Sequence, residues 1–186
     1  MELTYAQNAL GLTVDGKWGP KTAQAIATAI KTDKSYLRVK LSPSFELREL
    51  LVSDTAARRG ISNLPDGAQL LALARLCENV LQPVRNHFAA PVVVTSGLRS
   101  PALNKALRGS KTSQHCYGEA ADFTVAGFPD ITVAKWIAAS LPFDQLILEF
   151  PPQGWIHCSF GPRARRQTLT AKKGRFGTKY LPGLQP

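Results

Sequence analysis

The sequence predicts an α+β fold: a small antiparallel sheet packed by helices, with a short helical segment at the N-terminus. Apolar residues recur at helical spacing through much of the first half of the chain, whereas runs rich in β-branched residues recur from residue 91 onward. Two of these later runs flank Pro151-Pro-Gln-Gly154, which is typical of a hairpin. Helices followed by mostly antiparallel strands form the α+β pattern.

Residues 1–33 are expected to form a helical unit of their own. A short helix over 5–14 is followed by a turn at Asp15-Gly16 and by a second helix over 21–30. Pro20 suits the first position of that second helix, where its missing N–H needs no partner.

Residues 34–43 are expected to be a linker, and 44–186 to form the main domain. This domain should open with two short helices, over 44–51 and 54–59. A longer amphipathic helix should follow over 69–84.

Three side chains near this longer helix have structural interpretations. Asp66 is placed to cap its N-terminus. Cys77 lies on the apolar stripe, which predicts a core position. His87 has no partner motif around it, so we interpret it as structural rather than as a metal ligand.

The rest of the main domain alternates between strands and helices. In chain order we expect a strand at 91–96, a helix at 101–107, a strand at 119–125, a helix at 130–140, and strands at 144–150 and 155–160.

Composition narrows the class of protein. With 186 residues, 44% hydrophobic and 19% charged, the chain can form one well-packed domain plus a small appendage. No run of about 18 apolar residues is present, so no transmembrane segment is expected. The N-terminal residues lack the basic and apolar regions of a signal peptide, and three cysteines are too few for a disulfide framework. We therefore expect synthesis in a reducing cytoplasm, as a monomer.

The net charge of +10 favours an acidic partner, such as an anionic polymer or lipid. No nucleic-acid-binding signature accompanies this charge, so nucleic acid is not expected as a partner.

Three residues indicate a metal site. His115 and Asp122 are seven residues apart with Gly118 between them, and His157 comes far downstream. Two imidazoles and one carboxylate give a tetrahedral zinc ion three protein ligands and leave one position open to water. Such a water has a pKa of about 7, so hydroxide is available at neutral pH. A histidine alone in a loop is usually solvated, and it is the combination of the three that indicates zinc.

The motifs around these residues resemble a known family. Ser96-Gly-Leu-Arg-Ser-Pro101, Ser113-Gln-His-Cys-Tyr-Gly-Glu-Ala-Ala-Asp122 and Gly154-Trp-Ile-His-Cys-Ser159 occur in the order found in D-Ala-D-Ala carboxypeptidases and dipeptidases. These zinc peptidases belong to a group that includes lysostaphin-type enzymes and the hedgehog domain. The resemblance covers about residues 45–160. It implies zinc as the cofactor and His115, Asp122 and His157 as its ligands.

The hairpin suggests a catalytic base. If its loop is centred on Gln153, Glu149 lies directly across from His157, with Cβ atoms about 5 Å apart. Glu149 is then a general base for the zinc water, and Asp144 is the rival candidate. In the related family the acidic base usually lies closer to the second histidine than the eight residues found here.

Further site residues follow from the same motifs. Arg99 comes just after a buried strand, where its guanidinium suits a substrate carboxylate or a developing oxyanion. A surface ion pair is the alternative. In the related dipeptidases this arginine stabilises the transition state. The resemblance also places Ser113 and Gln114 with Arg99 in substrate binding. Cys158 is an alternative zinc ligand to His157, but in a strand it points to the opposite face.

The N-terminal unit resembles a second family. Its string Ala6-Gln-Asn-Ala-Leu-Gly-Leu-Thr-Val-Asp-Gly-Lys-Trp-Gly-Pro-Lys-Thr-Ala-Gln-Ala-Ile26 is similar to the peptidoglycan-binding module of cell-wall hydrolases, in a short version. The alternative is a helical hairpin that only packs on the main domain.

Together these resemblances imply a zinc-dependent peptidoglycan peptidase that cuts a D-Ala-containing bond of the wall stem or cross-link. A bacteriophage endolysin, made in the host cytoplasm and acting on the wall, is the expected setting. Alternatives are a D,D-carboxypeptidase or dipeptidase on soluble precursors, and a non-catalytic wall-binding or virion protein. A hedgehog-like binding domain fits less well, because Glu149 and Arg99 are placed for catalysis.

The last 26 residues, 161–186, hold seven basic residues and no acid. The basic residues are Arg163, Arg165, Arg166, Lys172, Lys173, Arg175 and Lys179. We expect this segment to attract an anionic polymer, over the 8–10 Å or so that salt screening allows. A segment that packs on the sheet is the alternative.

Overall fold

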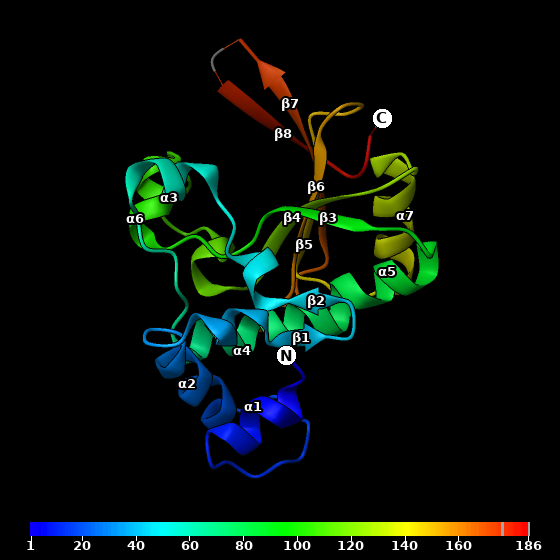
Figure 1. The fold of residues 1–186 in the computed structure, drawn as a ribbon. Coiled ribbons are helices and arrows are strands. Elements are labelled where there is room, and N and C mark those ends of the chain that lie inside the picture. Colours follow the sequence, from blue (N-terminus) through cyan, green and yellow to red (C-terminus); the bar gives the residue numbers. More distant parts are fainter. Residues whose placement is uncertain (176, 186) are drawn as a thin grey trace.

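A six-stranded sheet forms the centre of the computed structural model, which describes residues 1–175 and 177–185 (Figure 1). Its strands, in the order in which they lie side by side, are β3 (Val92–Ser96), β4 (Ala120–Val125), β6 (Trp155–Ser159), β5 (Gln145–Glu149), β7 (Gln167–Gly174) and β8 (Gly177–Pro182). The predicted α+β class is confirmed.

The sheet is mixed rather than purely antiparallel, because β5 and β7 run parallel. The end of β6 already lies beside the start of β5, where Cys158 pairs with Leu146. A short connection therefore brings the chain to the outer side of β5, and Gln167 pairs with Gln145. The chain then turns back through β8, so the basic C-terminal segment forms an edge hairpin.

Seven α-helices accompany the sheet in the described part of the chain. They are α1 (Leu3–Ala9), α2 (Pro20–Ala29), α3 (Asp54–Arg59), α4 (Gly67–Leu76), α5 (Gln82–Phe88), α6 (Pro101–Ala106) and α7 (Asp130–Ser140). In the view of Figure 1, α1, α2 and α4 lie below the sheet, and α7 lies beside it. Short turns of 3₁₀ helix are η1 (Lys34–Arg38), η2 (Leu47–Leu50) and η4 (Gln114–Tyr117), and η3 (Cys77–Leu81) is a π-helical turn.

One helix predicted from the sequence is wrong. The segment 44–51 instead contains strand β2 (Phe45–Glu46), which pairs with β1 (Lys40–Ser42), followed by η2. Glu46 and Glu49 form a capping box, which is the usual start of a helix. The helix that follows is only the short 3₁₀ turn η2.

The longer predicted helix continues beyond residue 84. It runs as α4, η3 and α5 without interruption to Phe88, where Ala89 adopts a left-handed conformation. Pro83 near the start of α5 lacks the N–H that an α-helix would bond to the carbonyl four residues earlier. The π-helical turn η3 directly precedes this position and accommodates the missing bond.

The two faces of the sheet differ in character. Alternate residues such as Phe123, Leu148 and Ile156 are fully buried in the hydrophobic core. Helix α7 packs against β4, β5 and β6. The intervening residues, including Asp122 and His157, lie on the opposite face.

The N-terminal helices share the main hydrophobic core. Ile26 of α2 and Leu70 of α4 are both fully buried in the same cluster. A Cβ on Gly67 would lie 2.5 Å from the Gln24 side chain, so α2 and α4 approach closely through this glycine. The division into units at 1–33, 34–43 and 44–186 stays a prediction.

Among the described residues, none of the helices is both long enough and apolar enough to cross a membrane.

Candidate metal centre

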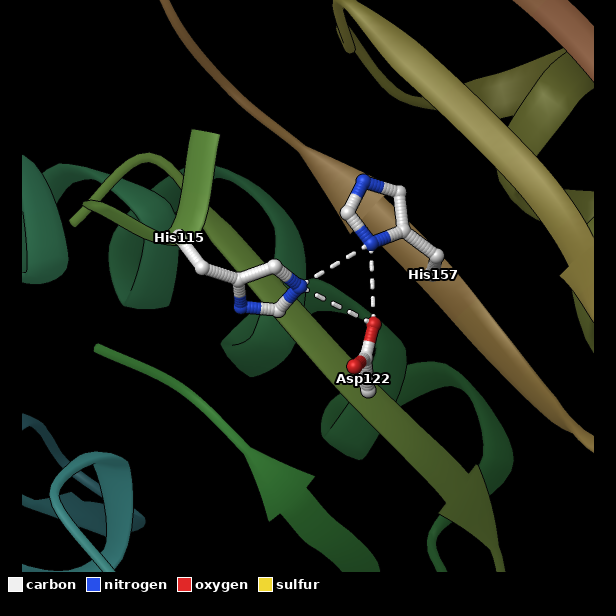
Figure 2. Close-up of side chains that lie close together, drawn as sticks. All are labelled: His115, Asp122 and His157. Carbon is white, nitrogen blue, oxygen red and sulfur yellow. Dashed lines mark hydrogen bonds and ion pairs between the residues drawn. The ribbon is translucent and has the colours of Figure 1, made fainter. Parts of the chain in front are cut away.

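Two neighbouring strands and one turn bring the predicted metal ligands together. Asp122 on β4 pairs directly with His157 on β6, so both side chains project from the same face. His115 reaches them from η4 (Figure 2). Gly118 ends this turn with a φ of +73°, and a Cβ there would lie 2.5 Å from the Gln69 carbonyl oxygen. Only glycine therefore lets the turn lie this close to α4.

The three side chains form a compact triangle. His115 Nε2 lies 3.2 Å from Asp122 Oδ1 and 3.2 Å from His157 Nδ1, and His157 Nδ1 lies 2.8 Å from Asp122 Oδ1. Zinc bonds of about 2.0–2.2 Å in a tetrahedron separate neighbouring ligand atoms by about 3.3–3.6 Å. To hold the ion, the two longer sides of the triangle need to expand by about 0.1–0.4 Å and the shortest side by about 0.5–0.8 Å.

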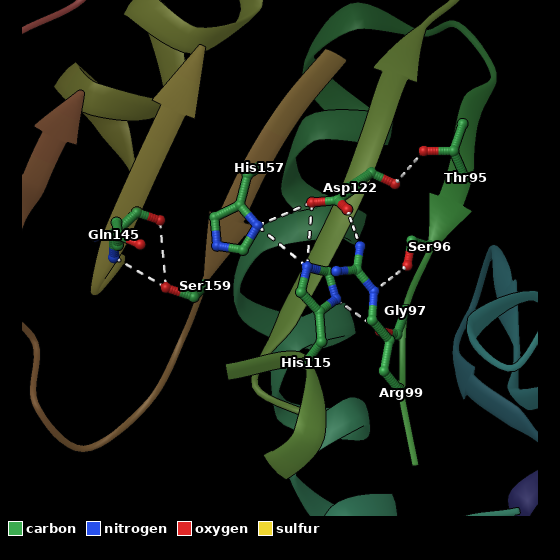
Figure 3. Close-up of polar contacts among 9 residues, drawn as sticks. All are labelled: Thr95, Ser96, Gly97, Arg99, His115, Asp122, Gln145, His157 and Ser159. Atoms are coloured by element: carbon green, nitrogen blue, oxygen red, sulfur yellow. Dashed lines mark hydrogen bonds and ion pairs between the residues drawn. The ribbon is translucent and has the colours of Figure 1, made fainter. Parts of the chain in front are cut away.

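The protonation pattern of His115 also fits a metal. Its Nδ1 lies 2.7 Å from the Gly97 carbonyl oxygen, which can only accept a hydrogen bond. In the neutral ring Nδ1 therefore carries the proton, and the lone pair of Nε2 points toward Asp122 and His157 (Figure 3). Electron-rich atoms that converge in this way suit a cation, and a fixed partner for the other ring nitrogen is usual for histidine ligands.

The carbonyl that orients His115 is itself held in place. A Cβ on Gly97 would lie 2.3 Å from the Leu50 carbonyl oxygen, so the backbone packs tightly there. Leu98 N donates to the same carbonyl over 2.8 Å, and Asn63 Nδ2 donates to the Leu98 carbonyl over 2.9 Å. The loop after β3 is therefore a rigid support for the ligand.

Arg99 holds the carboxylate ligand. Its Nη2 donates to Asp122 Oδ2, and its Nε donates to Ser96 Oγ over 2.8 Å (Figure 3). The bond leaves Asp122 Oδ1 directed at the two histidines. The sequence left a surface ion pair as the alternative for Arg99; in the structure its ion pair is largely buried and joins it to Asp122 of the triangle.

Electrostatics favour a charged Asp122 carboxylate beside a neutral His115 ring. Burial lowers the pKa of His115, so the neutral ring is favoured. Burial raises the pKa of Asp122, but interactions with the two histidines, including the hydrogen bonds that their ring nitrogens make to its carboxylate, outweigh burial and hold that pKa well below its ordinary value. These are the protonation states that bind zinc.

Glu149 lies on the same face but not directly across from His157, as the sequence interpretation had it. Glu149 pairs with Trp155, and His157 pairs with Ile147. The hairpin is centred on Pro152 rather than on Gln153, which shifts the register but keeps an odd loop length, so the face is unchanged. Glu149 therefore stands diagonally across from His157.

The surroundings of Glu149 suit proton transfer. Burial raises the pKa of its carboxyl, and the negative charge of Asp122 adds to this, while His157 and Arg99 act in the opposite direction. The carboxyl thus lies within electrostatic range of Asp122, His157 and Arg99.

Asp144, the rival base, is fully buried away from the triangle. Its Oδ1 accepts from Arg165 N and Nε at 2.9 and 2.8 Å. Its Oδ2 accepts from Arg165 Nη2 and Gln114 Nε2, both at 2.7 Å. Hydrogen bonding to Arg165 lowers the pKa of Asp144 to about 2. Asp144 therefore joins the C-terminal segment to the turn that carries His115.

The two residues assigned to substrate binding by resemblance lie next to His115. Gln114 is buried and donates to Asp144, so in this structure its amide supports the turn. Ser113 precedes the turn and its carbonyl accepts from Cys116 N over 3.0 Å. Their roles in substrate binding stay predictions.

The remaining histidine and cysteines lie outside the triangle. His87 stacks on Trp136 with ring centroids 4.1 Å apart. Cys158 is fully buried on the core face, opposite Ala121. Cys77 is fully buried in the core, and Cys116 lies on η4. Among the described residues, His115, Asp122 and His157 form the one group of this kind that could hold a metal.

The basic C-terminal segment contributes to the fold. Besides Arg165, Arg166 donates to the carbonyls of Ala138 and Leu141 and lies over the Phe143 ring, 4.9 Å from its centroid. We call Arg163, Lys173 and Lys179, which are exposed, the exposed tail cations.

Tyr180 on β8 was missed by the sequence analysis. It belongs to the same face as Glu149, two strands away. No motif surrounds it, and only the parallel pairing of β5 with β7 brings it to the site.

A large cavity lies apart from the metal triangle, none of whose three residues lines it. It has a volume of about 1440 Å³ and is lined by α4, α6 and the η4 residues Cys116 and Tyr117. His115 of the same turn faces the sheet instead.

Comparison with known proteins gives one match. Residues 43–159 match the family described as peptidase M15. No curated protein matches the chain. The matched segment contains the whole metal triangle, together with Arg99 and Glu149.

Proposed function

The chain belongs to the peptidase M15 family and is a zinc metallopeptidase, and from this premise we propose that it hydrolyses a D-Ala-containing peptide bond of peptidoglycan. The observation that carries the proposal is the His-Asp-His triangle within the matched segment, with the Glu149 carboxyl on the same sheet face.

Zinc held by His115, Asp122 and His157 would polarise the scissile carbonyl and make a water nucleophilic at neutral pH. Glu149 is the general base in our proposal: its carboxylate accepts the proton of the attacking water. It then donates this proton to the amine that leaves. A raised pKa suits both halves of this exchange, because it makes the carboxylate a better proton acceptor, while the carboxylic acid that results is still acidic enough to protonate an amine near neutral pH.

Arg99 has two roles in this proposal. Its Nη2 orients the Asp122 carboxylate, as described above. The rest of its guanidinium is available to stabilise negative charge on the carbonyl oxygen during attack, or to hold a substrate carboxylate.

Peptidoglycan is proposed as the substrate on two grounds. The metal-site motifs resemble those of D-Ala-D-Ala peptidases, and residues 6–26 resemble a wall-binding module. We favour endopeptidase over carboxypeptidase action, because a second binding site increases the local concentration of an enzyme on a polymer. A bacteriophage endolysin that acts on the bacterial wall is the setting that we propose.

Purified peptidoglycan offers the direct test. The protein should be incubated with it, with and without a chelator, and the products analysed for new amino groups and new reducing ends. A zinc peptidase releases amino groups in a chelator-sensitive reaction and leaves reducing ends unchanged. Release of free D-alanine from a soluble pentapeptide without solubilisation of the wall would instead favour the carboxypeptidase alternative. Wall binding without any cleavage would contradict the proposal.

A further inference from the structure

The C-terminal hairpin extends the catalytic face of the sheet. Glu149 pairs with Ala171 on β7, and Ala171 pairs with Tyr180 on β8. Residues that pair directly across strands point to the same face. Trp155, Glu149, Ala171 and Tyr180 therefore form one row, next to the row that holds Asp122 and His157.

Ala171, in the middle of this row, leaves room between the side chains of Glu149 and Tyr180. Ala171 carries only a methyl group and is fully buried, although it lies on the face opposite the helices. Tyr180 is half exposed, at 51%, and so is not simply a core residue. Strands lie about 4.8 Å apart, so the backbones of Glu149 and Tyr180 are separated by about 10 Å, with only the small Ala171 side chain between them on this face.

The electrostatics of Tyr180 agree with this placement. Burial raises the pKa of its phenol, and the negative charges of Glu149 and Asp122 raise it further. The phenol therefore stays protonated at neutral pH, where its hydroxyl can donate a hydrogen bond.

The positions of Arg99 and Glu149 define two sides of the metal centre. Arg99 follows β3, at one edge of the sheet, whereas Glu149 lies on β5, on the other side of His157. In the proposed function Glu149 protonates the leaving amine, so the amine fragment of the substrate lies on the side of β5, β7 and β8.

We propose that Tyr180 is a substrate-binding residue for the amine-side fragment, and that its phenol O–H donates to a carbonyl or carboxylate oxygen of that fragment. This inference rests on the proposed function. Tyr180 lies outside the segment matched by the family, which ends at residue 159. The contact would therefore be a specificity feature that the C-terminal hairpin adds to the peptidase domain.

The test uses the zinc-loaded full-length protein and two peptides with the same acyl side. One carries a single-residue amine fragment and the other a fragment of three residues. Tyr180→Phe removes only the hydroxyl. With the longer peptide it should raise KM about three- to tenfold, as expected for one lost hydrogen bond, and leave kcat nearly unchanged. With the shorter peptide KM should change by less than about twofold.

Thr178→Val is the matched control. It removes a hydroxyl from the same face of β8, two residue pairs nearer the hairpin turn, where Thr178 lies opposite Lys173. It should leave both peptides unaffected. Unchanged kinetics in Tyr180→Phe with both peptides, or an equal loss with both, would overturn the inference.

A binding measurement separates this inference from the proposed function. In a Glu149→Gln background, which prevents turnover, the longer peptide should bind about three- to tenfold more weakly when Tyr180→Phe is added. Equal affinity in the two variants would reject the role of Tyr180 while leaving the peptidase intact. Absence of cleavage by the wild-type protein would instead reject the proposed function.

Discussion

Replacement of Arg165 by Gln should destabilise the protein, although its position in a basic tail would suggest a tolerant site. The Arg165 side chain donates twice to the fully buried carboxylate of Asp144, at 2.8 and 2.7 Å. Arg165→Gln removes the charge and both of these bonds. The backbone N–H of residue 165 and the amide of Gln114 would remain as donors.

The expected loss follows from the pKa of Asp144. The folded protein lowers it from 3.8 to about 2, with hydrogen bonding to Arg165 as the largest cause. A difference of about 1.8 pKa units corresponds to about 2 kcal/mol of stability at neutral pH. A buried charge left without its partner costs about 3–5 kcal/mol in other proteins. Since two donors remain, we expect a loss of about 2–4 kcal/mol.

The pH dependence has a defined sign. A lowered pKa in the folded state contributes stability that is present above the ordinary pKa of 3.8 and is lost as pH falls through the folded value of about 2. The difference between wild type and Arg165→Gln should therefore be full above about pH 5 and shrink toward pH 2.

Urea unfolding at pH 7 and at about pH 2.5 measures this difference. A chelator should be present throughout, because zinc binds the folded state and would add its own stabilisation. At pH 7 the midpoint of Arg165→Gln should fall by about 1 M or more, for a typical urea dependence of about 1–3 kcal/mol per M. Arg163→Gln is the matched control, since it removes the same charge from an exposed neighbour. The reasoning would be refuted if Arg165→Gln and Arg163→Gln had equal urea midpoints. It would also be refuted if the loss of stability in Arg165→Gln, relative to wild type, were the same at both pH values.

Four further predictions concern the metal, the base, the tail and the bond cut. His115→Ala and His157→Ala should each lose stoichiometric zinc, as measured by metal content per chain; a retained equivalent would contradict the ligand set. Glu149→Gln should keep the metal but lose about 10²–10⁴-fold in turnover, and near-normal activity would exclude it as the base. Neutralising the exposed tail cations should weaken binding to whole walls at low salt and leave hydrolysis of a soluble peptide unchanged; equal losses would show that these residues serve the fold or the site. Wild-type protein should solubilise intact wall faster than it trims soluble pentapeptide, and the reverse order would argue against an endopeptidase.

The metal ligands could be predicted from the sequence because their signals are local. His115 and Asp122 lie within one short motif, and His157 has its own motif in a strand of clear β character. The period of two along a strand also separates His157 from Cys158, so the choice between them needed no tertiary information. The same periodicity kept Glu149 on the correct face even though the centre of the hairpin was misplaced.

Other parts of the site depend on contacts that no local pattern encodes. The register between Glu149 and Trp155 depends on the conformation of a loop with consecutive prolines. The bonds from Arg165 to Asp144 and from Gln114 to Asp144 join segments 21 and 30 residues apart. A sequence alone shows which side chains are charged, but not which of them form ion pairs or hydrogen bonds with one another.

The sequence by itself therefore determined the chemistry of the centre, two histidines and an aspartate suited to zinc, and the class of fold that presents it. Only the tertiary structure decided the contacts of the basic tail, where Arg165 binds the buried Asp144 carboxylate and Tyr180 lies in the same row of the sheet as Glu149. The physical reason is that residue type and local periodicity set which face a side chain takes. The pairing of distant strands instead depends on loop closure and on packing across the whole sheet.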